Sequence, residues 1–178
     1  MEENLSVNGL SYTVLRLLGR GKGGYSYLVS REGQEFVLKQ IHHEPCDYYT
    51  FGDKLAAELG DYEKLLTAGI RIPRLLAVDR EQERLLKEYI PGDTVMELCQ
   101  KGLLTEALYA QGQQMAELAM AAGLNIDYYP TNFVPDGQGL LYYIDYECNP
   151  YMDKWSFEQW GSSYWKNCRD ETLLNFLS

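Results

Sequence analysis

The chain has 178 residues, enough for one domain with a hydrophobic core or for two small lobes. Its residues are 46% hydrophobic and 13% aromatic, which excludes a disordered chain. Its 26 acidic and 16 basic side chains give a formal net charge of -10, which argues against a protein that binds nucleic acid or anionic membranes.

The N-terminal segment and the cysteines indicate the cellular compartment of the protein. The first twelve residues, MEENLSVNGLSY, are too polar for a signal peptide, and no apolar run has the length of a membrane span. Cys46, Cys99, Cys148 and Cys168 have no spacing typical of a zinc site or a disulfide framework. We therefore expect free thiols and a cytoplasmic protein.

The first predicted elements surround a glycine-rich stretch, LGRGKGGYSYLV, at residues 18–29. Residues 25–30 and 35–41 are β-rich, and 31–34 form a turn, so this part predicts an antiparallel hairpin. A dinucleotide-binding loop would be followed directly by a helix, so the predicted hairpin argues against a dinucleotide-binding fold. The glycines are then either a phosphate-covering flap or an ordinary turn between strands.

A helix, two strands and a break follow. Leucines and Tyr62 recur at three- and four-residue spacing and predict a helix over 51–68, with Gly69 as its stop. Residues 70–79 and 83–90 are expected to be strands. Pro91-Gly92-Asp93 breaks the pattern, and we place a lobe boundary there.

These elements predict an α+β fold of two lobes. Residues 1–90 would be an N-terminal lobe of antiparallel sheet plus one helix, and 91–178 an abbreviated, mostly helical C-terminal lobe. Thr105 is a predicted helix N-cap, and Gly123 is the predicted stop of that helix. The second lobe is expected to contain, in order, a helix, two short strands joined by a turn, and a tail with one or two short helices, over 105–122, 125–147 and 149–178.

The first lobe carries residues that suit phosphate chemistry. A flap over phosphates needs glycine, because side chains would keep the backbone away from them, and Gly19, Gly21 and Gly24 meet that need. Lys39 supplies a cation on the next strand. A carboxylate from the helix should hold its ammonium, and Glu58 shares a helix face with the apolar residues. Glu63 is the second choice, because it falls beside that stripe.

The second lobe carries three further polar residues. Asp127 and Asn132 stand five apart in IDYYPTN, and Asp145 ends an apolar strand. An Asp at that position suits a metal-binding carboxylate, although a lone Asp after a strand is usually a turn residue.

The chain resembles proteins with a protein-kinase-like fold over about residues 12–147. LGRGKGGYSYLV is similar to the kinase glycine loop, FVLK to its lysine strand, KEYIPG to its hinge, DYYPTN to its catalytic loop and IDYE to its D-F-G motif. The resemblance implies ATP and magnesium as cofactors. It implies the following roles: Asp127 as base, Lys39 and Glu58 as phosphate clamp, Asn132 and Asp145 as magnesium ligands, and the backbone of Glu88, Tyr89 and Ile90 as adenine contacts.

The sequence also departs from the kinase pattern. Asn125 and Ile126 replace the H-R that precedes the catalytic Asp, Tyr146 and Glu147 replace F-G, and no A-P-E follows. The segment after Asp145 instead resembles choline- and aminoglycoside-kinase-like sequences, in which Glu147 would supplement Asp145 at magnesium. Those families have a long C-terminal helical domain that this chain lacks.

Two functions remain open on these residues. One is a kinase that moves the γ-phosphoryl group of ATP to a hydroxyl acceptor, either a protein Ser/Thr or a small alcohol. The other is a nucleotide-binding pseudokinase that acts as an interaction or regulatory module. A partner protein or a second copy would complete the short second lobe. The aromatic, acidic tail is either core or a site for a cationic acceptor, and core is favoured.

Overall fold

The computed structural model describes residues 2–44 and 53–167. The chain divides into two compact units, Met1–Leu59 with Pro73–Tyr89, and Gly60–Ile72 with Ile90–Ser178. The division after Tyr89 lies beside the predicted lobe boundary, whereas Gly60–Ile72, which the prediction gave to the first lobe, belongs to the second unit. The α+β class is confirmed.

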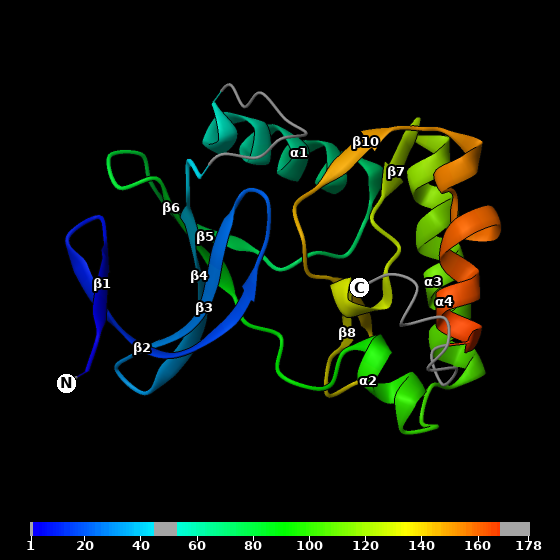
Figure 1. Ribbon diagram of the computed structural model, residues 1–178, viewed down its shortest axis with the longest axis horizontal. Coiled ribbons are helices and arrows are strands. Elements are labelled where there is room, and N and C mark those ends of the chain that lie inside the picture. The colour runs from blue at the N-terminus through cyan, green and yellow to red at the C-terminus, as the bar shows by residue number, and fades with distance from the viewer. Residues whose placement is uncertain (1, 45–52, 168–178) are drawn as a thin grey trace. The chain divides into compact units, whose positions relative to one another are not determined.

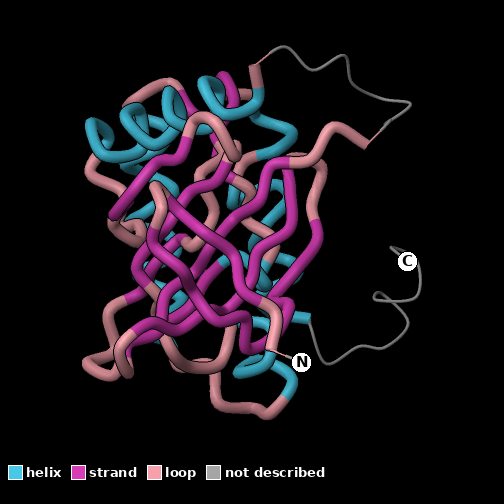
Figure 2. Tube along the Cα trace, turned by 90° about the vertical axis from the view of Figure 1, so that its left-hand side faces the viewer, coloured by secondary structure: helices cyan, strands magenta, loops and turns pink. Residues whose placement is uncertain are grey.

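The first unit is built on a six-stranded sheet with the strand order β1-β2-β3-β4-β6-β5. All its neighbouring strands are antiparallel, and Figure 2 shows the sheet twisted and curled. Figure 1 follows its strands from blue to green, at β1 (Asn4–Val7), β2 (Leu10–Arg20), β3 (Gly24–Arg31), β4 (Gln34–Ile41), β5 (Leu75–Asp79) and β6 (Arg84–Glu88).

Two tight turns fix the register of this sheet. Asn8 and Gly9 join β1 to β2 with φ of 50° and 82°, and Glu32 and Gly33 join β3 to β4 with φ of 52° and 76°. Two central residues with positive φ match the right-handed twist of the flanking strands. The predicted 25–41 hairpin is therefore confirmed, whereas β1 and the first half of β2 were not predicted.

Helix α1 (Lys54–Ala68) packs its first half on the sheet of the first unit. Leu55 joins Ile41 of β4 and Leu85 of β6 in one buried cluster. Residues 51 and 52 of the predicted 51–68 helix lie outside the described residues. Because Leu55 packs on the sheet, the polar residues that share its helix face also lie against the sheet.

The end of α1 explains why the next strand is shorter than predicted. Gly69 has φ of 82°, its N–H donates to the Leu66 carbonyl, and the N–H of Ile70 donates to the Leu65 carbonyl. These bonds close the helix in a Schellman motif. Pro73 follows and has no N–H for a strand ladder, so β5 begins only at Leu75 instead of residue 70.

The second unit combines helices with two small two-stranded sheets, in which β7 pairs with β10 and β8 with β9. Thr105 caps α3 as predicted, and its side chain accepts the N–H of Leu108. The elements of the unit, besides the second half of α1, are α2 (Val95–Gln100), α3 (Glu106–Ala121), β7 (Leu124–Ile126), the 3-10 turn η1 (Pro130–Asn132), β8 (Phe133–Pro135), β9 (Leu141–Tyr143), β10 (Cys148–Pro150), the short turns η2 (Asp153–Trp155) and η3 (Phe157–Gly161), and α4 (Ser162–Asn167).

Trp165 of α4 is the central side chain of the second unit. It is 1% exposed, and its ring lies 5.0 Å from that of Phe133 and 5.3 Å from that of Phe157. A Cβ on Gly112 of α3 would stand 2.8 Å from the Trp165 ring. The ring thus needs a glycine in the facing helix.

The predicted free thiols are found in part. Cys148 is a buried free thiol, and burial, with the nearby Asp61 carboxylate, raises its pKa to about 12. Cys99 is disulfide-bonded, so the prediction is wrong for that residue. Cys46 and Cys168 lie outside the described residues. No helix in the described ranges is long and apolar enough to cross a membrane.

Candidate functional site

The glycine-rich stretch forms the turn between β2 and β3. The N–H of Gly21 donates to the Gly24 carbonyl over 2.9 Å. A Cβ on Gly19 or Gly21 would meet no atom within 4 Å, so side chains are tolerated there in the described protein. A Cβ on Gly24 would stand 2.2 Å from the Gln40 carbonyl oxygen. Gly24 is therefore required by the close approach of β3 to β4.

Gly23, which the sequence analysis did not select, lies closest to the predicted phosphate-binding lysine. A Cβ on Gly23 would stand 3.6 Å from the Lys39 Nζ atom. Buried Lys54, the first residue of α1, donates from its ammonium to the carbonyl of Lys22 over 3.3 Å and also to the carbonyl of His42. The turn is thus tied to the helix on the side where Lys39 lies.

Lys39 is paired with Glu58. The Lys39 ammonium donates to Glu58 Oε1 over 2.9 Å, and the two side chains are 14% and 8% exposed. Both belong to the first unit, Lys39 on β4 and Glu58 on the first half of α1. The alternative carboxylate, Glu63, is exposed and belongs to the second unit. The helix face that buries Leu55 and Leu65 therefore selects Glu58.

A second lysine reaches the same carboxylate. Lys87 of β6 has its Nζ 3.8 Å from Glu58 Oε1, and its side chain is 5% exposed. Lys87 pairs with Val37 in the β4–β6 ladder, two residues before Lys39. Because alternate residues of a strand share a face, the two lysines lie on the same side of the sheet. Lys87 was not predicted as a site residue, because the sequence shows only a charge near the end of a strand.

The three predicted adenine contacts lie at the end of β6, where Glu88 is the last strand residue and Tyr89 and Ile90 follow it. The Glu88 N–H donates to the Arg74 carbonyl over 2.9 Å, so this N–H is used within the fold. Tyr89 is half-buried, and Ile90 is buried. Glu88 and Tyr89 belong to the first unit and Ile90 to the second. Their role in binding adenine stays a prediction.

In the second unit, Asp127 begins a tight polar loop. Its Oδ1 accepts the N–H of Tyr129 over 3.1 Å, and its carbonyl accepts the side-chain amide of Asn132 over 3.3 Å. These bonds fold the predicted D-x-x-x-x-N segment back on itself, with η1 as its last turn. The spacing of five residues thus brings Asp127 and Asn132 together.

Tyr143 links this loop to the segment with the predicted metal ligands. Its hydroxyl accepts the N–H of Asp127 over 3.1 Å and donates to the carbonyl of Glu147 over 2.8 Å. Full burial, with the nearby Asp145 charge, raises the Tyr143 pKa well above its usual value, so the hydroxyl keeps its proton. Sequence reasoning missed Tyr143, which looks like one more apolar strand residue.

The predicted magnesium ligands lie on neighbouring backbone. The Ile144 N–H donates to the Asn132 carbonyl over 2.9 Å, which places the residue before Asp145 beside Asn132. Asp145 Oδ1 accepts the N–H of Tyr146, whose ring packs 4.7 Å from that of Tyr62 on the second half of α1. Among the described residues no group of three His, Cys, Asp or Glu could hold a metal ion.

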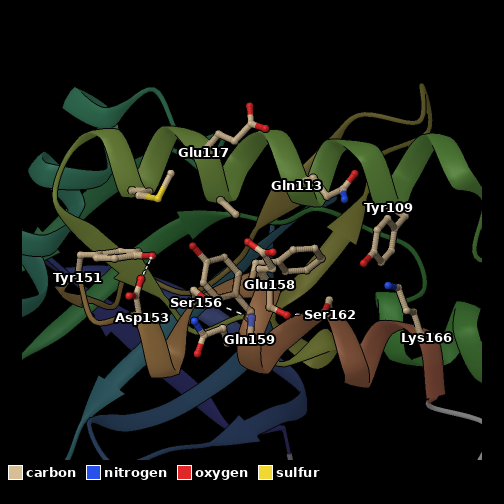
Figure 3. A pocket seen from close by; sticks show the side chains of 14 residues that line it. Tyr109, Gln113, Glu117, Tyr151, Asp153, Ser156, Glu158, Gln159, Ser162 and Lys166 are labelled. Atoms are coloured by element: carbon tan, nitrogen blue, oxygen red, sulfur yellow. Dashed lines mark hydrogen bonds between the residues drawn. The ribbon is translucent and has the colours of Figure 1, made fainter.

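A pocket of about 350 Å³ lies in the second unit between α3 and the segment around η2, η3 and α4 (Figure 3). The core role predicted for the tail is seen for its buried rings, whereas its role as a site for a cationic acceptor stays a prediction. Trp165 and Phe157 are buried in the core. Phe157 and Tyr151 both line the pocket, and Tyr151 donates to Asp153 over 2.7 Å. The lining combines rings with acidic, amide and hydroxyl groups, and includes Tyr109, Gln113, Glu117, Tyr128, Tyr151, Asp153, Glu158, Gln159 and Lys166.

No protein-family model matches the chain. No curated protein matches it either.

Proposed function

We propose that the chain is an ATP- and magnesium-dependent phosphotransferase, a kinase that moves the γ-phosphoryl group to a hydroxyl. The observation that carries the proposal is the Lys39–Glu58 ion pair, with its ammonium beside Gly23 of the glycine turn. A glycine-covered lysine held by a helical glutamate is the arrangement that protein kinases use to position the phosphates of ATP. Burying such a pair costs desolvation free energy, which a surface lysine avoids.

The loop in the second unit supports the same chemistry. The Asp127 carboxylate is half-buried and fixed by the N–H of Tyr129. An aspartate in this role accepts the proton of the acceptor hydroxyl as that oxygen attacks the γ-phosphorus. Its hydrogen bond to the backbone limits the rotation of the carboxylate.

The oxygen donors near this loop fit magnesium. Asn132 donates with its amide nitrogen to the Asp127 carbonyl, so the amide oxygen remains for a cation. Asp145 adds a carboxylate, and Glu147 is exposed on the same segment. Magnesium prefers oxygen ligands of these kinds. Bound magnesium would neutralise charge on the phosphate oxygens, and Asn132, Asp145 and Glu147 would hold it.

The acceptor is a hydroxyl of a protein Ser/Thr or of a small alcohol. A pseudokinase is the second candidate, and Asn125 favours it. This residue stands where kinases carry H-R, and its amide is used by the fold: Oδ1 accepts the Met152 N–H over 2.6 Å, and Nδ2 donates to the Trp155 carbonyl over 3.4 Å. A pseudokinase would bind ATP without metal, or not at all, and would transfer no phosphate.

Lys39→Met is expected to weaken ATP binding by about tenfold or more, since hydrogen bonds to charged groups contribute about 1.5–3 kcal/mol. The methionine keeps the length of the side chain and removes its charge. Isothermal titration with ATP measures the dissociation constant. Lys64→Met is the matched control, because it removes the same charge from a side chain that is 61% exposed. A wild-type protein that binds no ATP contradicts the proposal.

A further inference from the structure

Glu58 is shared by two ammonium groups of the first unit. Lys39 Nζ lies 2.9 Å and Lys87 Nζ 3.8 Å from the same oxygen, Oε1. The two lysines come from adjacent strands, β4 and β6, on the face of the sheet that α1 covers. Their arrangement around one carboxylate oxygen is therefore set by the sheet and the helix together.

The two lysines differ in depth. The side chain of Lys39 is 14% exposed and that of Lys87 is 5% exposed. The Lys39 ammonium is also the one that stands beside the glycine turn, 3.6 Å from a Cβ placed on Gly23. Lys39 is thus the lysine beside the glycine turn, and Lys87 is the more deeply buried of the two.

We propose that Lys87 is a positioning residue that holds part of the charge of Glu58 and thereby strengthens the attraction of the Lys39 ammonium for the phosphates of a nucleotide. A carboxylate that is paired with one lysine alone neutralises that lysine and weakens its attraction for an anion. A second ammonium on the same oxygen divides the attraction of the carboxylate. The ligand in this inference rests on the proposed function, whereas the sharing of Glu58 does not.

The sharing is tested without any nucleotide by a double-variant cycle. Lys39→Met and Lys87→Met each remove one of these two ammonium groups from Glu58, and the double variant removes both. A buried carboxylate that loses its partners is strongly destabilising. The folding equilibrium constant of the double variant should be about tenfold lower than the value expected if the losses of the two single variants simply multiplied. Urea denaturation of the four proteins measures the four constants.

Lys64→Met combined with Lys87→Met is the control pair, and its losses should simply multiply, because Lys64 lies in the other unit. If the double variant at Lys39 and Lys87 loses so much stability that it does not fold, while both single variants do, that outcome also supports the sharing of Glu58. Losses at Lys39 and Lys87 that multiply as in the control pair overturn the inference.

The effect on the ligand is tested with adenosine, ADP and ATP. Lys87→Met should weaken the binding of ATP by about tenfold and that of ADP by less, and it should leave the binding of adenosine unchanged. The reason is that the variant loses positive charge near the phosphates, which adenosine does not have. Lys87→Arg keeps the charge and should restore part of the ATP affinity. A loss of the same size for all three ligands, or no loss, means that Lys87 only packs and overturns its role toward phosphate.

A third comparison asks whether Lys87 acts through Glu58. In a Glu58→Gln background, Lys87→Met should change the ratio of ATP to adenosine affinity much less than in wild type. An unchanged effect would show direct contact with phosphate and would contradict the inference. If the wild type binds neither ATP nor ADP, the proposed function fails, and the urea cycle alone decides whether the lysines share Glu58.

Discussion

Asp127→Asn is expected to lower phosphoryl transfer by about 10²- to 10⁴-fold, the range that a positioned general base contributes. Asparagine has the same shape and keeps the Oδ1 atom that accepts the Tyr129 N–H, so the loop should keep its fold. It cannot take up the proton of the acceptor hydroxyl. Transfer from γ-labelled ATP to a panel of Ser/Thr peptides and small alcohols measures the turnover.

ATP affinity separates loss of the base from loss of the site. Asp127 is assigned to the acceptor and not to the nucleotide, so the dissociation constant of ATP should stay within about twofold of wild type. Asp136→Asn is the matched control in the same unit, where Asp136 Oδ1 accepts the N–H groups of Gln138 and Leu140 in a turn. Normal turnover in Asp127→Asn, or loss of ATP binding, contradicts the role given to this residue.

Trp165→Ala is expected to lower the free energy of unfolding by about 3–5 kcal/mol, as for other large aromatic side chains removed from cores. The ring is 1% exposed, and its indole N–H donates to the Tyr128 carbonyl over 2.8 Å. Truncation would leave a cavity against Gly112 and a carbonyl without its donor. Urea denaturation at neutral pH measures the change.

Trp165→Phe separates the contribution of the ring contacts to stability from that of the indole hydrogen bond. Phenylalanine keeps most of the ring contacts to Phe133 and Phe157 but gives up the N–H donor, so its loss should be clearly smaller. Because Tyr128 follows Asp127, any remaining turnover in Trp165→Phe reports how far α4 holds the loop in place. A loss below about 1 kcal/mol for Trp165→Ala would mean that the tail does not pack as described.

Local sequence signals predicted the elements that begin or end at a named residue. The two turn residues Glu32 and Gly33 lie inside the predicted 31–34 turn. Thr105 caps α3, and Gly69 closes α1 in the left-handed conformation. These signals act over a few residues, and so they can be recognised in a single sequence. The Asn8-Gly9 turn carried an equally strong signal that was not used.

The features that were missed depend on contacts between distant residues. Lys87 is buried because α1 covers its face of the sheet, and no local pattern shows that. Tyr143 joins Asp127 to Glu147 only once β9 lies beside the loop. The apolar stripe of α1 did select Glu58 over Glu63, because a helix face is readable from spacing alone.

The shift in melting temperature caused by ATP, with and without magnesium, tests the central claim most directly. Wild type and Asp145→Ala are compared, and their melting temperatures without ligand serve as the control for folding. A ligand that binds only the folded state raises the melting temperature with its concentration. The account predicts a rise that requires magnesium in wild type and is absent in Asp145→Ala. No rise in wild type with ATP and magnesium, or the same rise in Asp145→Ala, would contradict it.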